Sequence, residues 1–440
     1  MRENISAFIN SRRLIAVFAI LTIMFGGLWM AHTQMNRIPD LWEHVYRVSG
    51  ITNGDIVARP VTSVSDYHRI AADNYGGKVD WQWISLSDQH RDPFDAGVVQ
   101  LDSITASDDI GADVPYNNTA VYSPISYLPQ IFGFFLGKYL GLGATTTYYL
   151  SESIMLLVYT ILTTWGIALL PRFRLPMAVL LLSPPVIYHF SFAVSADSLT
   201  QALIITFSCM LFAMANRTPS CKEYVTLGII GALIAITKFA YAPLIFIPIA
   251  LLITHAPTTR RAKITVGTTI ILALALIIGW LRSTSTFVSN PASVSPSEVH
   301  ERTSGLLHNP MRAISAIWYS ISHLQGAFRT PLILLSIWIA FAVVLAAIII
   351  HAITNPVQWR ISLFWIFTYF MAVGAILATY LAMWLQGTAN GVPGVYIMQL
   401  RYLVPLFPMI LLCFLDNVQC IHHGKTKPVP LPSAMTHSMG

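Results

Sequence analysis

Two carboxylates and an imidazole stand close together early in the chain, at Asp40, Glu43 and His44. If this piece is helical, the spacings i, i+3 and i+4 place the three side chains on one face. Such a group can act as a general base, or Asp40 and Glu43 can bind a divalent cation such as Mg²⁺ or Mn²⁺. The alternative is structural, with Asp40 capping a helix and Glu43 in its first turn.

Two cations occur much later, each beside polar or aromatic residues. Lys238 lies between two short apolar segments and precedes Tyr241, and Arg401 follows Gln399 at the start of the last apolar segment. An ammonium or a guanidinium at a membrane surface can bind the phosphate of a lipid, which would make these four residues a binding site for the phosphate and its lipid. The alternative for both cations is ordinary contact with headgroups.

Five further residues are candidates for lining a cavity beside these groups. Tyr122 and Tyr127 each stand close to a proline, a pattern that predicts either a rigid wall of the site or simple anchoring at headgroup depth. His189, Ser195 and Asp197 fall at the ends of two neighbouring apolar segments. An acid at membrane depth is costly and is therefore a functional candidate, although Asp197 can also be the cap of the helix that begins there.

The composition defines the elements that must position these residues. Hydrophobic residues make up 55% of the 440 and charged residues only 10%, against roughly 25% in an average soluble domain. Apolar runs of bilayer-crossing length predict an all-α polytopic membrane protein with about 10 transmembrane helices. We expect these helices at 14–31, 146–170, 175–191, 196–215, 223–237, 240–255, 264–282, 330–351, 361–384 and 402–416.

The basic residues indicate orientation. The net charge of +6 does not indicate a nucleic-acid partner, because Lys and Arg cluster at the ends of the apolar segments. The positive-inside rule places both termini in the cytoplasm and the long loops outside the cytoplasmic membrane. Counting 125–142 as a further span would move Arg172 and Arg174 outside, so we expect 123–142 to be an interfacial helix.

The resulting organisation has one large membrane domain with two long outer loops. We expect a cytoplasmic N-terminus at 1–13, a transmembrane domain at 14–416, a first outer loop at 32–145, a second outer loop at 283–329 and a disordered cytoplasmic tail at 417–440. This orientation brings Asp40, Tyr122, Asp197, Lys238 and Arg401 to the same outer face. An acid that can activate a hydroxyl, beside cations that can hold a phosphate, is what transfer from a lipid-phosphate donor requires.

The chain resembles the bacterial multi-pass membrane proteins grouped as domain of unknown function 2142, which are placed among the C-type (GT-C fold) glycosyltransferases. The resemblance covers residues from about 14 to 416 and rests on the order and spacing of short motifs. These are Pro39-Asp40 with Glu43-His44, Tyr122-Ser123-Pro124 with Tyr127-Leu128-Pro129-Gln130, Ser195-Ala196-Asp197, Lys238 with Tyr241-Ala242-Pro243, and Gln399 to Pro405.

This resemblance implies a polyprenyl-phosphate-linked sugar donor, an inverting transfer and a catalytic acid at the position of Asp40. Glu43 or His44 would orient the acceptor or bind a cation. The acceptor would be a cell-surface glycan, a glycolipid or a protein. Two departures stand out: Leu41 and Trp42 separate acids that are adjacent in the family, and Leu400 replaces a glycine before Arg401.

Two other classes of function are compatible with a polytopic chain. A transporter or flippase for lipid-linked sugars would carry ionisable residues at mid-membrane depth. The small number of such residues and the long loops on one side argue against it. A non-catalytic subunit of a surface-polysaccharide assembly system would not bring Asp40, Lys238 and Arg401 to one cavity.

Overall fold

The computed structural model describes residues 11–65, 73–90, 98–99, 101, 104–106, 108–188, 190–254, 258–288, 294–322, 331–354, 359–395 and 400–423. Most of this chain is helical. In these ranges, five helices are long and apolar enough to cross a membrane, which confirms a helical membrane protein. They are α2 (Arg12–His32), α7 (Ala144–Leu169), α10 (Ala196–Ala215), α13 (Arg260–Ser283) and the part Leu363–Gly387 of α18 (Trp359–Gly387).

Other helices coincide with the remaining predicted spans, but they are shorter or less fully described. They are α8 (Arg174–Leu182), α9 (Pro184–Ile187), α11 (Cys221–Thr237), η4 (Phe239–Phe246), α12 (Ile247–Thr254), α17 (Pro331–Thr354), η7 (Leu400–Tyr402), η8 (Val404–Leu406) and α19 (Phe407–His423). The total of about ten spans therefore stays a prediction.

One predicted span, 175–191, is not a continuous helix. The helix α8 ends at Leu182, and Ser183 adopts an extended backbone with φ −68° and ψ 144° before the short α9 begins. Proline lacks a backbone N–H and disfavours helical geometry in the residue before it, so Pro184 and Pro185 interrupt the helix here.

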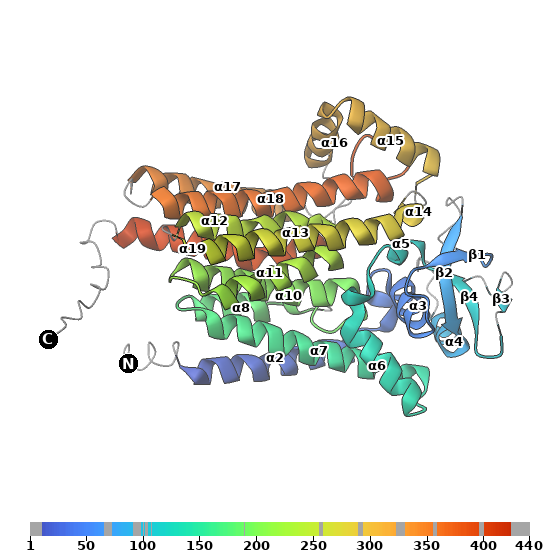
Figure 1. Ribbon diagram of the computed structural model, residues 1–440. Helices are drawn as coiled ribbons and strands as arrows, with labels where there is room; N and C mark the ends of the chain where they lie inside the picture. The colour runs from blue at the N-terminus through green and yellow to red at the C-terminus, as the bar shows by residue number, and fades with distance from the viewer. Residues whose placement is uncertain are drawn as a thin grey trace.

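The helices run side by side as a bundle whose ends differ (Figure 1). The start of α2 and the end of α19 lie at one end, and the elements of the first predicted loop lie at the other. The helix α10 is central, because 94% of its apolar window is buried. A helix that is apolar on every side is suited to such a position.

The first predicted loop contains a small β-sheet, so the prediction of an all-α chain is wrong here. Four antiparallel strands pair in the order β1 (Arg59–Val61), β2 (Asn74–Asp80), β4 (Gly111–Pro115) and β3 (Thr105–Ala106). The central ladder joins β2 to β4, which are far apart in sequence, and short strands of this kind carry little periodic signal. Gly76 is required there, because a Cβ would lie 1.8 Å from the carbonyl oxygen of Val114.

Short helices connect this sheet to the bundle. The helix α3 (Leu41–Thr52) follows η1 (Met35–Arg37) and packs on β2, and nearly all of its side chains are buried. The helices α4 (Trp81–Gln89) and α5 (Asn117–Ala120) flank it. The N-terminus of α3 is thereby held between the sheet and the bundle.

The predicted interfacial segment 123–142 is helical, as η3 (Pro124–Tyr127) and α6 (Leu128–Tyr139). One face of α6 packs closely on α7 through Gly133, and Leu128, Phe132 and Phe135 on other faces are exposed. An exposed apolar face agrees with a position at a membrane interface, although the depth of α6 stays a prediction.

The second predicted outer loop contains α14 (Ser285–Val288), α15 (Pro296–His308) and α16 (Met311–Ser322). At the opposite end of the bundle, α19 extends to His423, so the predicted disorder is wrong for 417–423; residues 424–440 lie outside the described chain. Asp416 near the end of α19 pairs with Arg172 and accepts a hydrogen bond from the Trp365 indole at 2.8 Å. These partners come from distant segments and hold the helix in place.

Candidate active site

Asp40 occupies the N-cap position of α3 in an unusual conformation. Its backbone is left-handed, with φ 56° and ψ 25°, and its side chain makes no capping hydrogen bond. The carboxylate instead accepts a hydrogen bond from Arg401 Nη2 at 2.6 Å. Aspartate tolerates this conformation better than most residues, but here its side chain is directed away from the first turn of α3. The structural interpretation of Asp40 as a simple cap is therefore wrong.

Arg401 and Lys238 both face Asp197, which brings four charged residues together. Arg401 Nε lies 3.7 Å from Asp197 Oδ2, and the Lys238 ammonium pairs directly with the other oxygen of this carboxylate. Asp197 stands in the first turn of α10, Lys238 ends α11 and Arg401 lies in η7. Asp197, Lys238 and Arg401 are buried. The two acids and two cations carry opposite charges in equal number, which makes their burial tolerable.

Tyr402 was not among the predicted site residues, yet it lies between the two cations. Its ring centroid is 4.3 Å from Lys238 Nζ and 5.1 Å from Arg401 Cζ, and its hydroxyl accepts a hydrogen bond from Arg401 Nη2 at 3.1 Å. The hydroxyl of Tyr241 donates to the Tyr402 carbonyl at 2.8 Å. The Arg-Tyr dipeptide was the available signal, because an aromatic face beside a cation stabilises it.

His44 belongs to a second, uncharged chain of hydrogen bonds. Its Nδ1 lies 2.7 Å from the Tyr127 hydroxyl, and its Nε2 lies 3.3 Å from the Ser195 hydroxyl. The Ser195 oxygen also accepts a hydrogen bond from the backbone N–H of Asp197 at 3.2 Å. Burial lowers the pKa of His44 to about 4, against the opposing charges of Asp40 and Asp197. The imidazole is therefore neutral at pH 7, with one nitrogen able to donate and the other to accept.

Glu43 takes different partners from Asp40 and His44. Its carboxylate accepts hydrogen bonds from the backbone N–H of Asn118 at 2.9 Å and from the side-chain amide of Asn118 at 3.1 Å. Glu43 is fully buried and its backbone carbonyl accepts from the Thr119 hydroxyl at 2.9 Å. Glu43 therefore anchors α3 to α5 rather than joining the charged cluster.

The two predicted cation ligands do not form a shared site in this arrangement. One oxygen of Asp40 is held by the positive Arg401, and both oxygens of Glu43 accept hydrogen bonds from Asn118. In the described ranges, no three His, Cys, Asp or Glu side chains converge as metal ligands would. A divalent cation thus stays a prediction.

The remaining predicted residues border this site or lie outside the described chain. Tyr122 is close to both groups, with its ring centroid 6.0 Å from that of His44 and 5.9 Å from Lys238 Nζ. Gln130, which the quoted motif includes but which was given no role in the site, donates to the carbonyls of Ala193 and Ser195 at 3.2 and 3.3 Å and so positions the start of α10. His189 and Gln399 lie outside the described residues.

A small pocket opens beside the charged cluster. It is lined by Ile38, Pro39, Phe190, Ala193, Ser195, Asp197, Ser198 and Arg401. The N-terminus of α10 contributes three of these residues, and a helix N-terminus attracts anions. Arg401 Nε–H is buried and makes no hydrogen bond to any described residue. A guanidinium N–H without a hydrogen-bond partner can donate to an anionic oxygen. The pocket beside Arg401 has room for about one water molecule.

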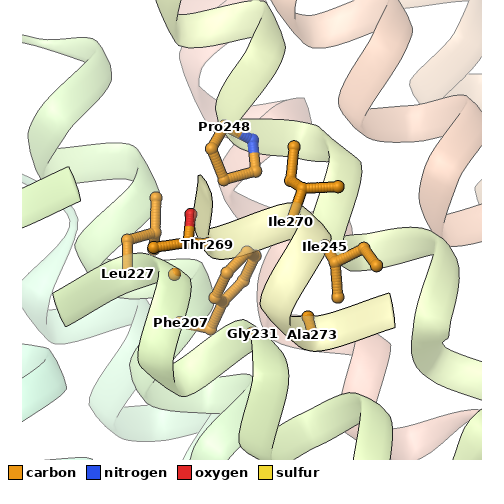
Figure 2. Close-up of a pocket in the computed structure, with 9 residues that line it drawn as sticks. Phe207, Leu227, Gly231, Ile245, Pro248, Thr269, Ile270 and Ala273 are labelled. Atoms are coloured by element: carbon orange, nitrogen blue, oxygen red, sulfur yellow. The ribbon is translucent and has the colours of Figure 1, made fainter. Parts of the chain in front are cut away.

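A second pocket is apolar (Figure 2). Phe207, Leu227, Ile245 and Ile270 converge on it from α10, α11, η4 and α13, and Thr269 is the only lining residue with a polar side chain. The two helices α11 and η4 that wall this pocket are joined at Lys238. An apolar crevice thus adjoins the helices that carry one cation of the charged cluster.

The ionised form of Asp40 is favoured. Burial raises the pKa of Asp40, but the charge of Arg401 and its hydrogen bond oppose burial, and the pKa ends below its ordinary value. Near neutral pH, Asp40 is consequently a carboxylate that can accept a proton. The same Arg401 that keeps Asp40 ionised also lines the small pocket at the start of α10, together with Asp197.

Comparison with known proteins assigns the chain to a family but does not assign it an activity. No curated protein and no solved structure matches the chain. Residues 23–410 match the family described as "Predicted membrane protein (DUF2142)", which covers most of the 440 residues and all of the charged cluster. The chain therefore belongs to the DUF2142 family of membrane proteins.

Proposed function

We propose that this protein is a membrane glycosyltransferase that transfers a sugar from a polyprenyl-phosphate-linked donor to an acceptor outside the cytoplasmic membrane. The observation that carries the proposal is the proximity of Asp40, an ionised carboxylate, to a pocket with an unused arginine donor. A base and a phosphate site within one side chain's reach of each other are the minimum that such a transfer needs.

In the proposed reaction, Asp40 removes the proton from an acceptor hydroxyl as its oxygen attacks the anomeric carbon. A new carbon–oxygen bond forms on one face of the sugar while the bond to the donor phosphate breaks on the other, which inverts the configuration. The bonding electrons leave with the polyprenyl phosphate, and the proton remains on Asp40 until solvent removes it. The chemistry balances without a further reactant.

The cations act on the departing phosphate. Arg401 Nε–H and the ammonium of Lys238 both lie beside Asp197, which lines the pocket. Negative charge that develops on the phosphate is stabilised by donors that are already in place, since they need no reorganisation during the reaction. Asp197 balances their charge when no donor is bound, and the apolar crevice in Figure 2 offers an environment for hydrocarbon on the same helices.

The proposal is tested in two stages with purified protein in lipid nanodiscs. Native mass spectrometry compares binding of undecaprenyl phosphate with that of undecaprenol, which has the same chain and no charge. We expect binding of the phosphate only, weakened at least tenfold in Arg401→Met and Lys238→Met. A matched control, Lys222→Met, changes an exposed lysine at the opposite end of α11 and should bind normally.

The second stage measures release of undecaprenyl phosphate from undecaprenyl-phosphate-linked sugars in the presence of cell-envelope glycan fractions. Release that depends on both the fraction and Asp40 supports the transferase. Binding of the phosphate with no release from any donor, together with movement of labelled donor across proteoliposomes, would instead identify a flippase and refute the enzyme. Equal binding of undecaprenyl phosphate and undecaprenol would refute the proposal that Lys238 and Arg401 bind the phosphate.

A further inference from the structure

The helix α16 presents an apolar stripe that no described part of the chain covers. Met311, Ile314 and Trp318 recur at spacings of three and four residues and therefore share one face. They are 61%, 58% and 69% exposed, and Leu307 at the end of α15 adds to the stripe at 80%. An exposed patch of four large apolar side chains needs a partner of its own.

The opposite face of α16 fixes how this stripe is oriented. Ala316 and Ser320 are buried against the segment that follows α18, where Gly394 has no room for a side chain because a Cβ would lie 2.7 Å from the Ala316 carbonyl oxygen. The Ser320 hydroxyl accepts a hydrogen bond from the Val395 N–H at 2.7 Å. The apolar stripe therefore points away from the rest of the protein, because the opposite face of α16 is the one that packs.

The neighbouring α15 attaches this pair of helices firmly to the end of α18. Arg302 is buried, donates to the carbonyls of Thr388 and Ala389 at 3.0 and 2.8 Å, and also bonds the Trp384 carbonyl. It thus satisfies the Trp384 carbonyl, which the last turn of α18 leaves without a helical partner, and two carbonyls just after the helix. Arg302 is itself held by Glu298 at 2.9 Å.

The position of α16 along the bundle indicates which kind of partner covers the apolar stripe. Figure 1 shows α16 beside the last turns of α18, level with them rather than beyond them. The part of α18 that it flanks is a candidate membrane span ending at Gly387. A helix fixed at this level meets the boundary between hydrocarbon and headgroups, where apolar side chains bury and tryptophan is favoured.

We propose that α16 lies in the membrane interface at the sheet-bearing end of the bundle and inserts Met311, Ile314 and Trp318 among the lipids. Arg312, which is exposed beside the stripe, is suited to lipid phosphates. The partner is a lipid surface rather than a second protein, because the stripe lies beside a spanning helix instead of above the membrane. The proposal stands independently of the transferase.

The test places a spin label at single cysteines in nanodiscs, in a background in which Cys209, Cys221, Cys413 and Cys420 are replaced. Relaxation by oxygen, which partitions into lipid, is compared with relaxation by a water-soluble nickel chelate. Labels at positions 314 and 318 should respond several-fold more to oxygen than to nickel. Labels at Glu301 and Thr303, exposed polar residues of α15, are the matched controls and should respond mainly to nickel.

Each other outcome overturns the proposal. Strong relaxation by nickel at 314 and 318 would put α16 in water. Protection from both reagents would mean that a second copy or another protein covers the stripe. Melting temperatures of the labelled proteins show whether the fold is retained. A further label at Met311→Cys, on the same face as position 314, ensures that no single substitution decides the result.

Discussion

Replacing Asp40 by asparagine removes a negative charge and little else. Asparagine tolerates the left-handed backbone that Asp40 adopts, with φ 56°, better than most residues do. Its amide oxygen can still accept the hydrogen bond from Arg401 Nη2 that spans 2.6 Å in the wild-type protein. The variant therefore separates the carboxylate's basicity from its role in holding the backbone.

The expected effects on stability and on rate differ in size. Breaking a buried ion pair costs about 3–5 kcal/mol. The Asp40 side chain is 29% exposed and Asp197 lies 3.7 Å from the same guanidinium, so we expect a smaller loss. Loss of a general base slows a reaction by a factor on the order of 10²–10⁴. Turnover should thus fall much further than stability.

The assay is transfer from a polyprenyl-phosphate-linked sugar in nanodiscs, with thermal unfolding recorded on the same samples. We expect kcat to fall and KM for the donor to stay the same or decrease, because Asp40 no longer competes for Arg401. An increase in KM with kcat preserved would mean that Asp40 only positions Arg401. Full activity in Asp40→Asn would refute its role as the base.

Three further changes test the surroundings of the site. The pKa of His44 is about 4 in the folded protein and 6.5 ordinarily, so between these pH values the unfolded chain binds more protons than the folded one. The free energy of unfolding should therefore fall as the pH drops from 6.5 toward 4, by up to about 3 kcal/mol. The variant His44→Gln should show a weaker dependence of the melting temperature on pH. Gly133→Leu should prevent α6 from packing on α7, because a Cβ would lie 2.4 Å from the Ser151 hydroxyl, whereas Gly143→Ala, where nothing lies within 4 Å, should melt normally. Tyr402→Ala should weaken binding of undecaprenyl phosphate more than Tyr402→Phe does, since only phenylalanine keeps the ring beside Lys238 and Arg401; equal loss in both variants would assign the effect to the hydroxyl.

The helices were predictable from sequence because their signal is local. Apolar runs of sufficient length give α2, α7, α10, α13 and α18 directly. The sheet was not predictable in the same way, because β2 and β4 pair across a long stretch of intervening chain and each is only five to seven residues long. Ser183, followed by two prolines, was a visible reason to shorten the predicted span 175–191.

The sequence predicted which residues come together at the site better than it predicted how their side chains are arranged. Residue type and orientation selected Asp40, Asp197, Lys238 and Arg401, which the fold does bring together. The predicted common face with Glu43 is wrong for a specific reason. Asp40 has left-handed backbone angles and so does not continue the helical spacing, which leaves Glu43 directed to Asn118. Helical spacing holds only where the backbone is helical at both residues.

The left-handed turn at Asp40 determines which partner its carboxylate takes. Had Asp40 capped α3 in the usual way, its carboxylate would have accepted from the first N–H groups of that helix rather than from Arg401. The observed turn directs it to η7 and leaves its stabilisation to a cation from the last part of the chain. Asp40 and Arg401, 361 positions apart, therefore depend on each other, and Arg401 lines the small pocket to which Pro39, the neighbour of Asp40, also contributes. This ion pair distinguishes Asp40 from a helix cap, because the carboxylate of a cap accepts from its own helix and gains nothing from a distant arginine.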